Sequence, residues 1–177
     1  NVYLTGSASA GFPTTANAFQ RDFARSGQII DSDESILDEF LGIFPITDAF
    51  VTKISQDGSS LDYSTFLGGA GWDKGWGIDV KDGFAYVTGH TGGLRSGDIG
   101  FPTTSGVLQE THGNGIFDPS ISPIFPDLVQ FAAADGFVTK LSPTGSELIY
   151  STYLGGNGLD YGYEIVVQQG KALILLS

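Results

Sequence analysis

Asp48-Ala49-Phe50-Val51-Thr52-Lys53-Ile54-Ser55 is nearly repeated as Asp135-Gly136-Phe137-Val138-Thr139-Lys140-Leu141-Ser142, at an offset of 87 residues (135 − 48). A second block, Leu61-Asp62-Tyr63-Ser64-Thr65-Phe66-Leu67-Gly68-Gly69, returns at the same offset as Leu148-Ile149-Tyr150-Ser151-Thr152-Tyr153-Leu154-Gly155-Gly156. Self-similarity at a fixed offset is typical of repeat proteins, in which each unit leaves an apolar face that only a neighbour can cover. The repeat therefore indicates a fold much more closely than it indicates an activity.

Other blocks recur in the same order, so one unit is duplicated. They pair Val2-Tyr3-Leu4-Thr5-Gly6 with Ala85-Tyr86-Val87-Thr88-Gly89, Phe12-Pro13-Thr14-Thr15 with Phe101-Pro102-Thr103-Thr104, Ala18-Phe19-Gln20 with Val107-Leu108-Gln109, and residues 71–80 with 158–167. The first repeat, residues 1–89, contains part of one structural unit and the start of the next. The second repeat spans residues 90–177.

The local pattern of each repeat is that of β-structure. Short runs rich in Val, Ile, Thr and aromatic residues are bounded by Gly and Asp-Gly turns, which predicts strands at 2–5, 49–54, 61–66, 76–80 and 84–88. Apolar groups occur on both faces of the 61–67 run, as expected for a sheet stacked between two others. Four short strands per unit, joined by tight turns, predict an all-β fold of four-stranded antiparallel β-propeller blades, about two in this chain.

Two segments at equivalent places interrupt this pattern, one at about residues 21–47 and the other at about 110–134. In the first, apolar residues at helical spacing follow Asp33 and Glu34, which predicts a short helix over 35–41. The second is expected to be mostly irregular, with a turn of helix near 128–131. Insertions in repeat proteins usually map to one face, often the binding face.

The composition excludes several classes of function. Twenty acidic and eight basic side chains give a formal net charge of −12, so nucleic-acid binding is not expected, because such a surface repels phosphate. The absence of Cys excludes disulfides, thiolate zinc sites and Cys nucleophiles. No apolar run approaches the roughly 18 residues needed to cross a bilayer.

The repeated strings resemble one known family. Tyr86-Val87-Thr88-Gly89, Phe101-Pro102-Thr103-Thr104, Asp135–Ser146 and Leu148–Gly156 together resemble the bacterial SBBP repeat, whose name refers to a seven-bladed β-propeller. The resemblance covers both copies and leaves out only the two insertions. It implies a propeller blade of an exported or cell-surface bacterial protein. The repeat has no catalytic motif, so the resemblance implies no catalytic residue.

Calcium is the one cofactor that the sequence raises, and two stretches are candidates. Asp73 and Asp160 each end a Gly-Gly-x-Gly-x-Asp string that resembles the start of a calcium-binding nonapeptide. The alternative is a glycine-rich turn capped by the Asp. The acidic run with Asp31, Asp33 and Glu34 is a second candidate, and a solvated helix start is its alternative.

The remaining candidate residues are histidines, aromatic residues and two lysines. His90 and His112 are the only groups with unperturbed pKa values near neutrality, and their spacing resembles no known site. Four aromatic residues of the turns could stack on a sugar, although packing is the commoner role of such residues: Trp72, Trp76, Tyr161 and Tyr163. Lys53 and Lys140 are expected to reach solvent or an Asp.

Three functions are consistent with this sequence, and fold alone cannot choose among them. The first is a non-enzymatic structural or protein-interaction module, whose partners are further blades of the same polypeptide or other chains. The second is a carbohydrate-binding propeller, and the third, with least support, is a propeller hydrolase or lyase. A closed propeller has roughly four to eight blades, so we expect the chain to be part of a longer propeller or an oligomer subunit.

Overall fold

The structure is a computed structural model, and it describes residues 1–24, 47–92, 100–113 and 134–177. These residues form nine β-strands and no helix. The all-β prediction is therefore confirmed for the described residues. The helices expected at 35–41 and 128–131 lie outside them.

The strands form three antiparallel sheets. The first sheet has the order β1 (Val2–Ala8), β2 (Asp48–Ile54), β3 (Leu61–Leu67). The second has the order β4 (Trp72–Lys81), β5 (Phe84–Gly92), β6 (Ala134–Leu141), β7 (Leu148–Leu154). The third pairs β8 (Gly162–Gln168) with β9 (Lys171–Leu176). The expected strands are confirmed, and β4 begins at Trp72, four residues before its predicted start.

The register of the strand pairs repeats together with the sequence. Gly6 of β1 faces Phe50 of β2, and Gly89 of β5 faces Phe137 of β6. The hairpins β4–β5 and β8–β9 turn through Asp82-Gly83 and Gln169-Gly170, whose backbones have positive φ at both positions. Two-residue hairpins require this conformation because its twist matches that of the strands, and glycine adopts it without strain.

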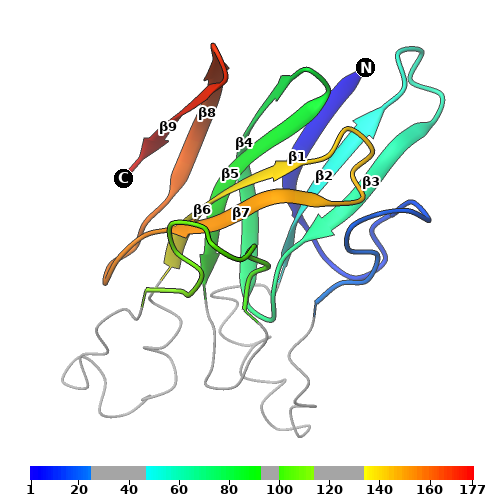
Figure 1. The fold of residues 1–177 in the computed structure, drawn as a ribbon. Coiled ribbons are helices and arrows are strands. Elements are labelled where there is room, and N and C mark those ends of the chain that lie inside the picture. Colours follow the sequence, from blue (N-terminus) through cyan, green and yellow to red (C-terminus); the bar gives the residue numbers. More distant parts are fainter. Residues whose placement is uncertain (25–46, 93–99, 114–133) are drawn as a thin grey trace, which may run out of the picture.

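The three sheets are stacked in sequence order. In Figure 1 the four-stranded sheet lies between β1–β3 on one side and β8–β9 on the other. A first hydrophobic core joins the first two sheets, with Val51, Tyr63 and Leu67 packed among Val87 and Phe137. A second core joins the four-stranded sheet to the last one, with Tyr86 and Val138 packed against Ile165. Each sheet thus buries its apolar face only against a neighbour, as the repeat predicts.

The same close contact occurs at both junctions between sheets. Gly75 of β4 lies against the Thr5 side chain of β1, and Gly162 of β8 lies against Thr88 of β5, with no room for a Cβ on either glycine. Both threonine hydroxyls donate to the carbonyl of the phenylalanine on the next strand, Thr5 to Phe50 at 2.8 Å and Thr88 to Phe137 at 2.7 Å. The repeated glycine is therefore a packing requirement.

The recurring Phe-Pro-Thr-Thr and Gln blocks cover the outer edges of the first two sheets, β3 and β7. Thr15 N donates to Ser64 O and Phe66 N donates to Gln20 O, so this segment runs along β3. The second copy makes the equivalent bonds to β7, from Thr104 N to Ser151 O and from Tyr153 N to Gln109 O. Because exposed strand edges promote aggregation, these segments protect β3 and β7.

Candidate functional site

The sequence-predicted calcium residues fall into two groups. Asp31, Asp33 and Glu34 lie outside the described residues. Asp73 is the second residue of β4 and is completely buried, whereas Asp160 lies just before β8 and is half-buried. Asp73 and Asp160 therefore occupy equivalent places at the two junctions.

Asp73 caps the glycine-rich turn that precedes it. Its Oδ2 accepts a hydrogen bond from Gly69 N at 2.8 Å, and its backbone N donates to Thr47 O at 2.6 Å. Burial raises the pKa of Asp73 from 3.8 to about 8, although the Thr91 hydroxyl and Gly69 N oppose this rise. The cap expected of this Asp is confirmed, and its carboxyl group is buried in the protein interior.

A second buried carboxylate, Asp48, lies beside Asp73. Its Oδ2 accepts hydrogen bonds from Gln20 Nε2 at 2.8 Å and from Ala24 N at 2.9 Å. Burial raises its pKa to about 7, since the two donors only partly replace the lost water. Sequence reasoning missed Asp48 as a site residue. One feature of the sequence could have indicated it: the most strongly repeated block begins with an Asp in both copies, Asp48 and Asp135.

Gly68 brings the two carboxyl groups together. A Cβ on Gly68 would lie 2.6 Å from Asp48 Cγ and 2.6 Å from Asp73 Oδ2, so these two atoms are no more than twice that distance apart. The charge of Asp48 further raises the pKa of Asp73. The Oδ1 atoms of both carboxyl groups are buried and have no hydrogen-bond partner. The first junction therefore contains two adjacent carboxyl groups, each with one oxygen satisfied and one bare.

The second junction contains the equivalent pair, Asp135 and Asp160, but Asp160 is half-buried where Asp73 is completely buried. Asp135 Oδ2 accepts from Gln109 Nε2 at 3.0 Å and from Gly113 N at 2.6 Å, and Asp160 Oδ2 accepts from Gly156 N at 2.8 Å. Burial raises the pKa of Asp135. Here, however, His112 Nε2 lies 3.8 Å from Asp135 Oδ1.

These carboxylates come in pairs, which limits the chemistry they can perform. In the described ranges no three His, Asp or Glu side chains gather at one point. Oxygen atoms are the ligands that Ca²⁺ and Mg²⁺ prefer, and Ca²⁺ takes about six to eight of them. A cation at either pair would therefore also need hydroxyl, carbonyl or water oxygens.

His90 lies at the centre of an aromatic cluster that contains all four sequence-predicted aromatic residues. His90 Nδ1 accepts a hydrogen bond from Trp76 Nε1 at 2.8 Å, which requires Nδ1 to be unprotonated. Burial and the charge of Lys74 lower the pKa of His90 to about 4. Ring centroids in the cluster lie 4.6 to 6.1 Å apart, and its members are Trp72, Trp76, His90, Tyr161 and Tyr163.

This cluster is only partly available to a ligand. Trp76 and Tyr163 are each 44% exposed, so part of each ring faces solvent. The ammonium group of Lys74 lies 3.8 Å from the Trp76 ring centroid and covers one face of it. Packing therefore accounts for much of the cluster, and an exposed aromatic surface remains on Trp76 and Tyr163.

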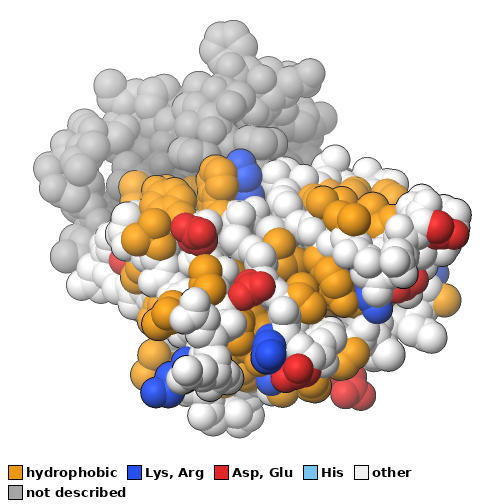
Figure 2. All heavy atoms as spheres, turned by 90° about the horizontal axis from the view of Figure 1, so that it is seen from above, with side chains coloured by type: hydrophobic (Ala, Val, Ile, Leu, Met, Phe, Trp, Pro, Cys, Tyr) orange, Lys and Arg blue, Asp and Glu red, His pale blue; other side chains and the backbone are white. Residues whose placement is uncertain are grey.

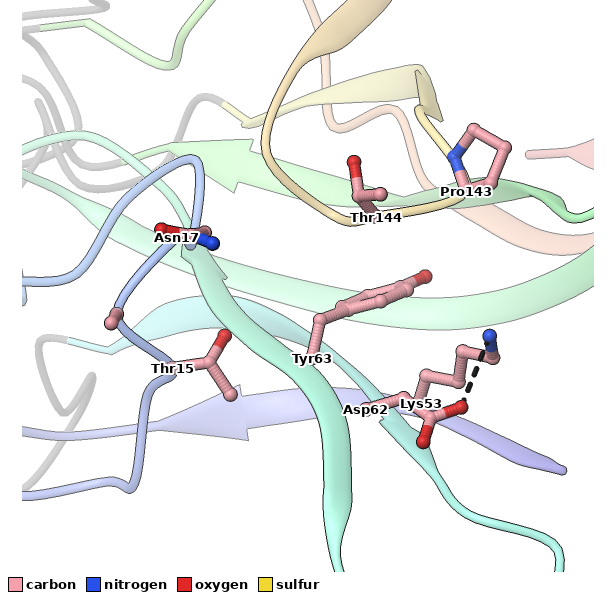
Figure 3. A pocket seen from close by; sticks show the side chains of 8 residues that line it. Thr15, Asn17, Lys53, Asp62, Tyr63, Pro143 and Thr144 are labelled. Atoms are coloured by element: carbon pink, nitrogen blue, oxygen red, sulfur yellow. Dashed lines mark ion pairs between the residues drawn. The ribbon is translucent and has the colours of Figure 1, made fainter.

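A pocket of about 370 Å³ lies between the first sheet and the β6–β7 turn. Figure 3 shows the Tyr63 ring in its centre, with the Lys53–Asp62 ion pair on one side and Pro143 and Thr144 on the other. The Lys53 Nζ to Asp62 Oδ2 distance is 3.1 Å, so the prediction that Lys53 reaches an Asp is confirmed.

The equivalent lysine in the second repeat differs. Lys140 Nζ lies 4.3 Å from the Phe84 ring centroid and 5.0 Å from that of Tyr86. Lys140 is partly exposed, so the solvent alternative of the expectation is not contradicted, whereas Ile149 occupies the position of Asp62 and leaves no equivalent carboxylate to pair with. A cation–π contact replaces the ion pair.

The comparisons with known proteins give no identification. No family model matches the chain, and no curated protein matches it. None of the described segments forms a helix that is long and apolar enough to span a membrane.

Proposed function

We propose that this chain is a non-enzymatic structural or protein-interaction module built from β-propeller blades, in an exported or cell-surface bacterial protein. The observation that best supports this proposal is that both junctions between sheets use the same contacts. A Gly–Thr contact, a buried Asp and a hydrophobic core recur at each of them. A sheet of this kind is suited to receive another of the same kind on its face.

The outer sheets present apolar side chains that such a neighbour could cover. Val2 and Leu4 on β1 are 54% and 43% exposed, and Leu173 and Leu175 on β9 are 60% and 58% exposed. Figure 2 shows hydrophobic side chains in several patches on one face of the molecule, between acidic and basic groups. Full burial of an exposed Val or Leu contributes about 1.5–3 kcal/mol, so covering each of these half-exposed side chains contributes roughly half of that. The proposed partners are therefore sheets of the same repeat, in the same polypeptide or in another chain.

Sedimentation analysis of the purified chain tests this proposal. The wild type should self-associate as its concentration rises, and a variant combining Leu173→Ser and Leu175→Ser should associate less. Leu108→Ser is the matched control, because Leu108 is 82% exposed in a loop and should not contribute. A wild type that stays folded and monomeric at all concentrations would contradict the proposal.

Carbohydrate binding is the second candidate, favoured by the exposed aromatic surface of Trp76 and Tyr163. Aromatic faces stack on the apolar faces of sugar rings, and both side chains belong to the same cluster. A glycan array with the wild type and with Trp76→Ala tests it. Binding that Trp76→Ala abolishes would support this candidate, and an array without signal would exclude it for the glycans present.

A further inference from the structure

We propose that the first junction binds a hard, oxygen-preferring divalent cation, Ca²⁺ or Mg²⁺, between Asp48 and Asp73. The protein ligands would be Asp48 Oδ1, Asp73 Oδ1 and the hydroxyl of Thr91. The resemblance to a calcium-binding nonapeptide concerned only Asp73 among these three residues, and in that motif the Asp belongs to loops repeated in tandem. The site proposed here instead joins three strands of two different sheets.

The first argument is that the three side chains at this junction are completely buried and two of them carry an oxygen that no N–H group in the ranges that the structure describes satisfies. Asp48, Asp73 and Thr91 are each 0% exposed. Among the described residues, no N–H group donates to Asp48 Oδ1 or Asp73 Oδ1, and the only group near the Thr91 hydroxyl that the structure shows bonding it is the Asp73 carboxyl itself. In both carboxyl groups, N–H donors hold Oδ2 and thereby fix the orientation of Oδ1. Buried polar atoms are rarely left unsatisfied in folded proteins, so such a set calls for a ligand.

The second argument is proximity. Gly68 contacts both carboxyl groups, and the bond from Asp73 N to Thr47 O joins β4 to the residue before Asp48. Thr91 is the partner of Asp73 in the β4–β5 register. Directly opposed residues of an antiparallel pair have their side chains on the same face, so the Thr91 hydroxyl lies beside the Asp73 carboxyl.

The third argument is charge. In the described part of the chain, the lysine ion pairs join Lys53 to Asp62 and Lys81 to Asp82, and none reaches Asp48 or Asp73. Two adjacent buried carboxylates without a counter-charge are costly. Oxygen ligands and negative charge favour Ca²⁺ or Mg²⁺, and water or backbone carbonyls would complete the coordination shell.

The second junction differs from the first in the residue beside its buried Asp, which is a histidine where the first junction has a phenylalanine. His112 follows Gln109 by three residues, as Phe23 follows Gln20, so the two side chains are equivalent. His112 packs against Tyr153, and Phe23 packs against the equivalent Phe66. Among the residues that the structure describes, only the second junction therefore places a side chain that can become cationic beside the bare Asp oxygen, Asp135 Oδ1. We assign the cation site to the first junction alone.

Thermal unfolding and calorimetric titration of the whole chain, with CaCl₂ and MgCl₂ added separately after treatment with EDTA, test the proposal. The melting temperature should rise by several degrees with at least one ion, at a stoichiometry of one, and EDTA should reverse the rise. Asp73→Asn should abolish this response, because Asn keeps the oxygen that Gly69 N bonds but removes the charge. Asp82→Asn is the control, since Asp82 lies in an exposed turn, and it should respond as the wild type does.

Two further variants keep the test decisive if Asp73→Asn does not fold. Thr91→Val removes only the Thr91 hydroxyl and should weaken binding by about tenfold, as the loss of a single group around a metal site commonly does. Phe23→His places an imidazole beside Asp48, as in the second junction, and should also weaken binding. A wild type that responds to neither ion would overturn the proposal, and so would unchanged binding by Thr91→Val. A third outcome also contradicts the proposal. If the wild type responds to neither ion and Asp73→Asn is more stable than the wild type by the same amount with and without ions, the Asp48–Asp73 pair holds a proton in place of a cation.

Discussion

Gln20 and Asp48 flank the first insertion and are joined by a hydrogen bond of 2.8 Å from Gln20 Nε2 to Asp48 Oδ2. Gln109 and Asp135 flank the second insertion and make the same bond at 3.0 Å. Each Gln side chain also accepts from the backbone N of a glycine after the outer strand, Gly68 or Gly155. The Gln side chain therefore fastens the base of each insertion to the sheet and satisfies a buried carboxylate.

We predict that Gln20→Ala lowers the free energy of unfolding by about 1–3 kcal/mol, because it removes both bonds and leaves buried polar groups unsatisfied. Urea unfolding measures the loss. Gln109→Ala should have a similar effect. Gln56→Ala, in an exposed turn, should change stability by less than about 0.5 kcal/mol. Equal effects of Gln20→Ala and Gln56→Ala would show that the Gln20 bonds do not contribute to stability.

Gly68→Ala is predicted to be strongly destabilising. The new Cβ would lie 2.6 Å from both Asp48 and Asp73, whose side chains are fixed by hydrogen bonds and cannot move aside. Overpacking in a rigid site costs about 1–3 kcal/mol or more. Gly156→Ala is the control, since a Cβ there meets nothing within 4 Å and its φ is not positive. Soluble yield and thermal unfolding of the two variants should differ clearly.

The sequence predicted the strands well because they are short runs rich in Val, Ile, Thr and aromatic residues that end at Gly or Asp-Gly turns. It also predicted the Asp73 cap and the Lys53 ion pair. It did not reveal the Asp48–Asp73 pair, because an Asp at the start of a strand usually faces solvent. Burial of Asp48 depends on Gln20 and Ala24, which are brought to it only by folding. The sequence also did not reveal the contact of Lys140 with the Phe84 and Tyr86 rings, because these side chains come from a neighbouring strand.

Removal of residues 25–46, replaced by a short Gly-Ser linker, should leave the fold largely intact. Ala24 N and Asp48 Oδ2 are 2.9 Å apart, so the two sides of the gap already meet, and shortening a loop changes its closure entropy only slightly. Circular dichroism and thermal unfolding measure the outcome. If the insertions make the partner contacts, as their difference between the repeats suggests, this deletion should also weaken partner binding. Loss of the β-sheet signal would contradict the prediction.

His90 should make stability depend on pH between about 4 and 6.5. Burial lowers its pKa to about 4 in the folded state, whereas the unfolded chain has the ordinary value of 6.5. The unfolded state therefore binds more protons in this window, and stability is lost as the pH falls through it, by at most about 1.4 kcal/mol per pH unit. Urea unfolding of the wild type and of His90→Asn, compared at several pH values, isolates this contribution. The stability of the wild type relative to the variant should fall from pH 7 to 4.5 and stay constant from pH 7 to 8.

The Asp48–Asp73 pair should produce the opposite trend when divalent ions are chelated. The folded-state pKa values of about 7 and about 8 lie above the ordinary value of 3.8, so the folded state retains protons that the unfolded state has released. Stability from this pair should therefore fall as the pH rises from about 4 to about 8. Asp73→Asn removes one of the two titrating groups and the repulsion between them, so in EDTA it should show a shallower dependence and exceed the wild type in stability at pH 8. Urea unfolding in EDTA across this range measures both slopes. If the free energies of unfolding of the wild type and of Asp73→Asn depend on pH in the same way, Asp73 does not take up a proton on folding and the prediction is wrong.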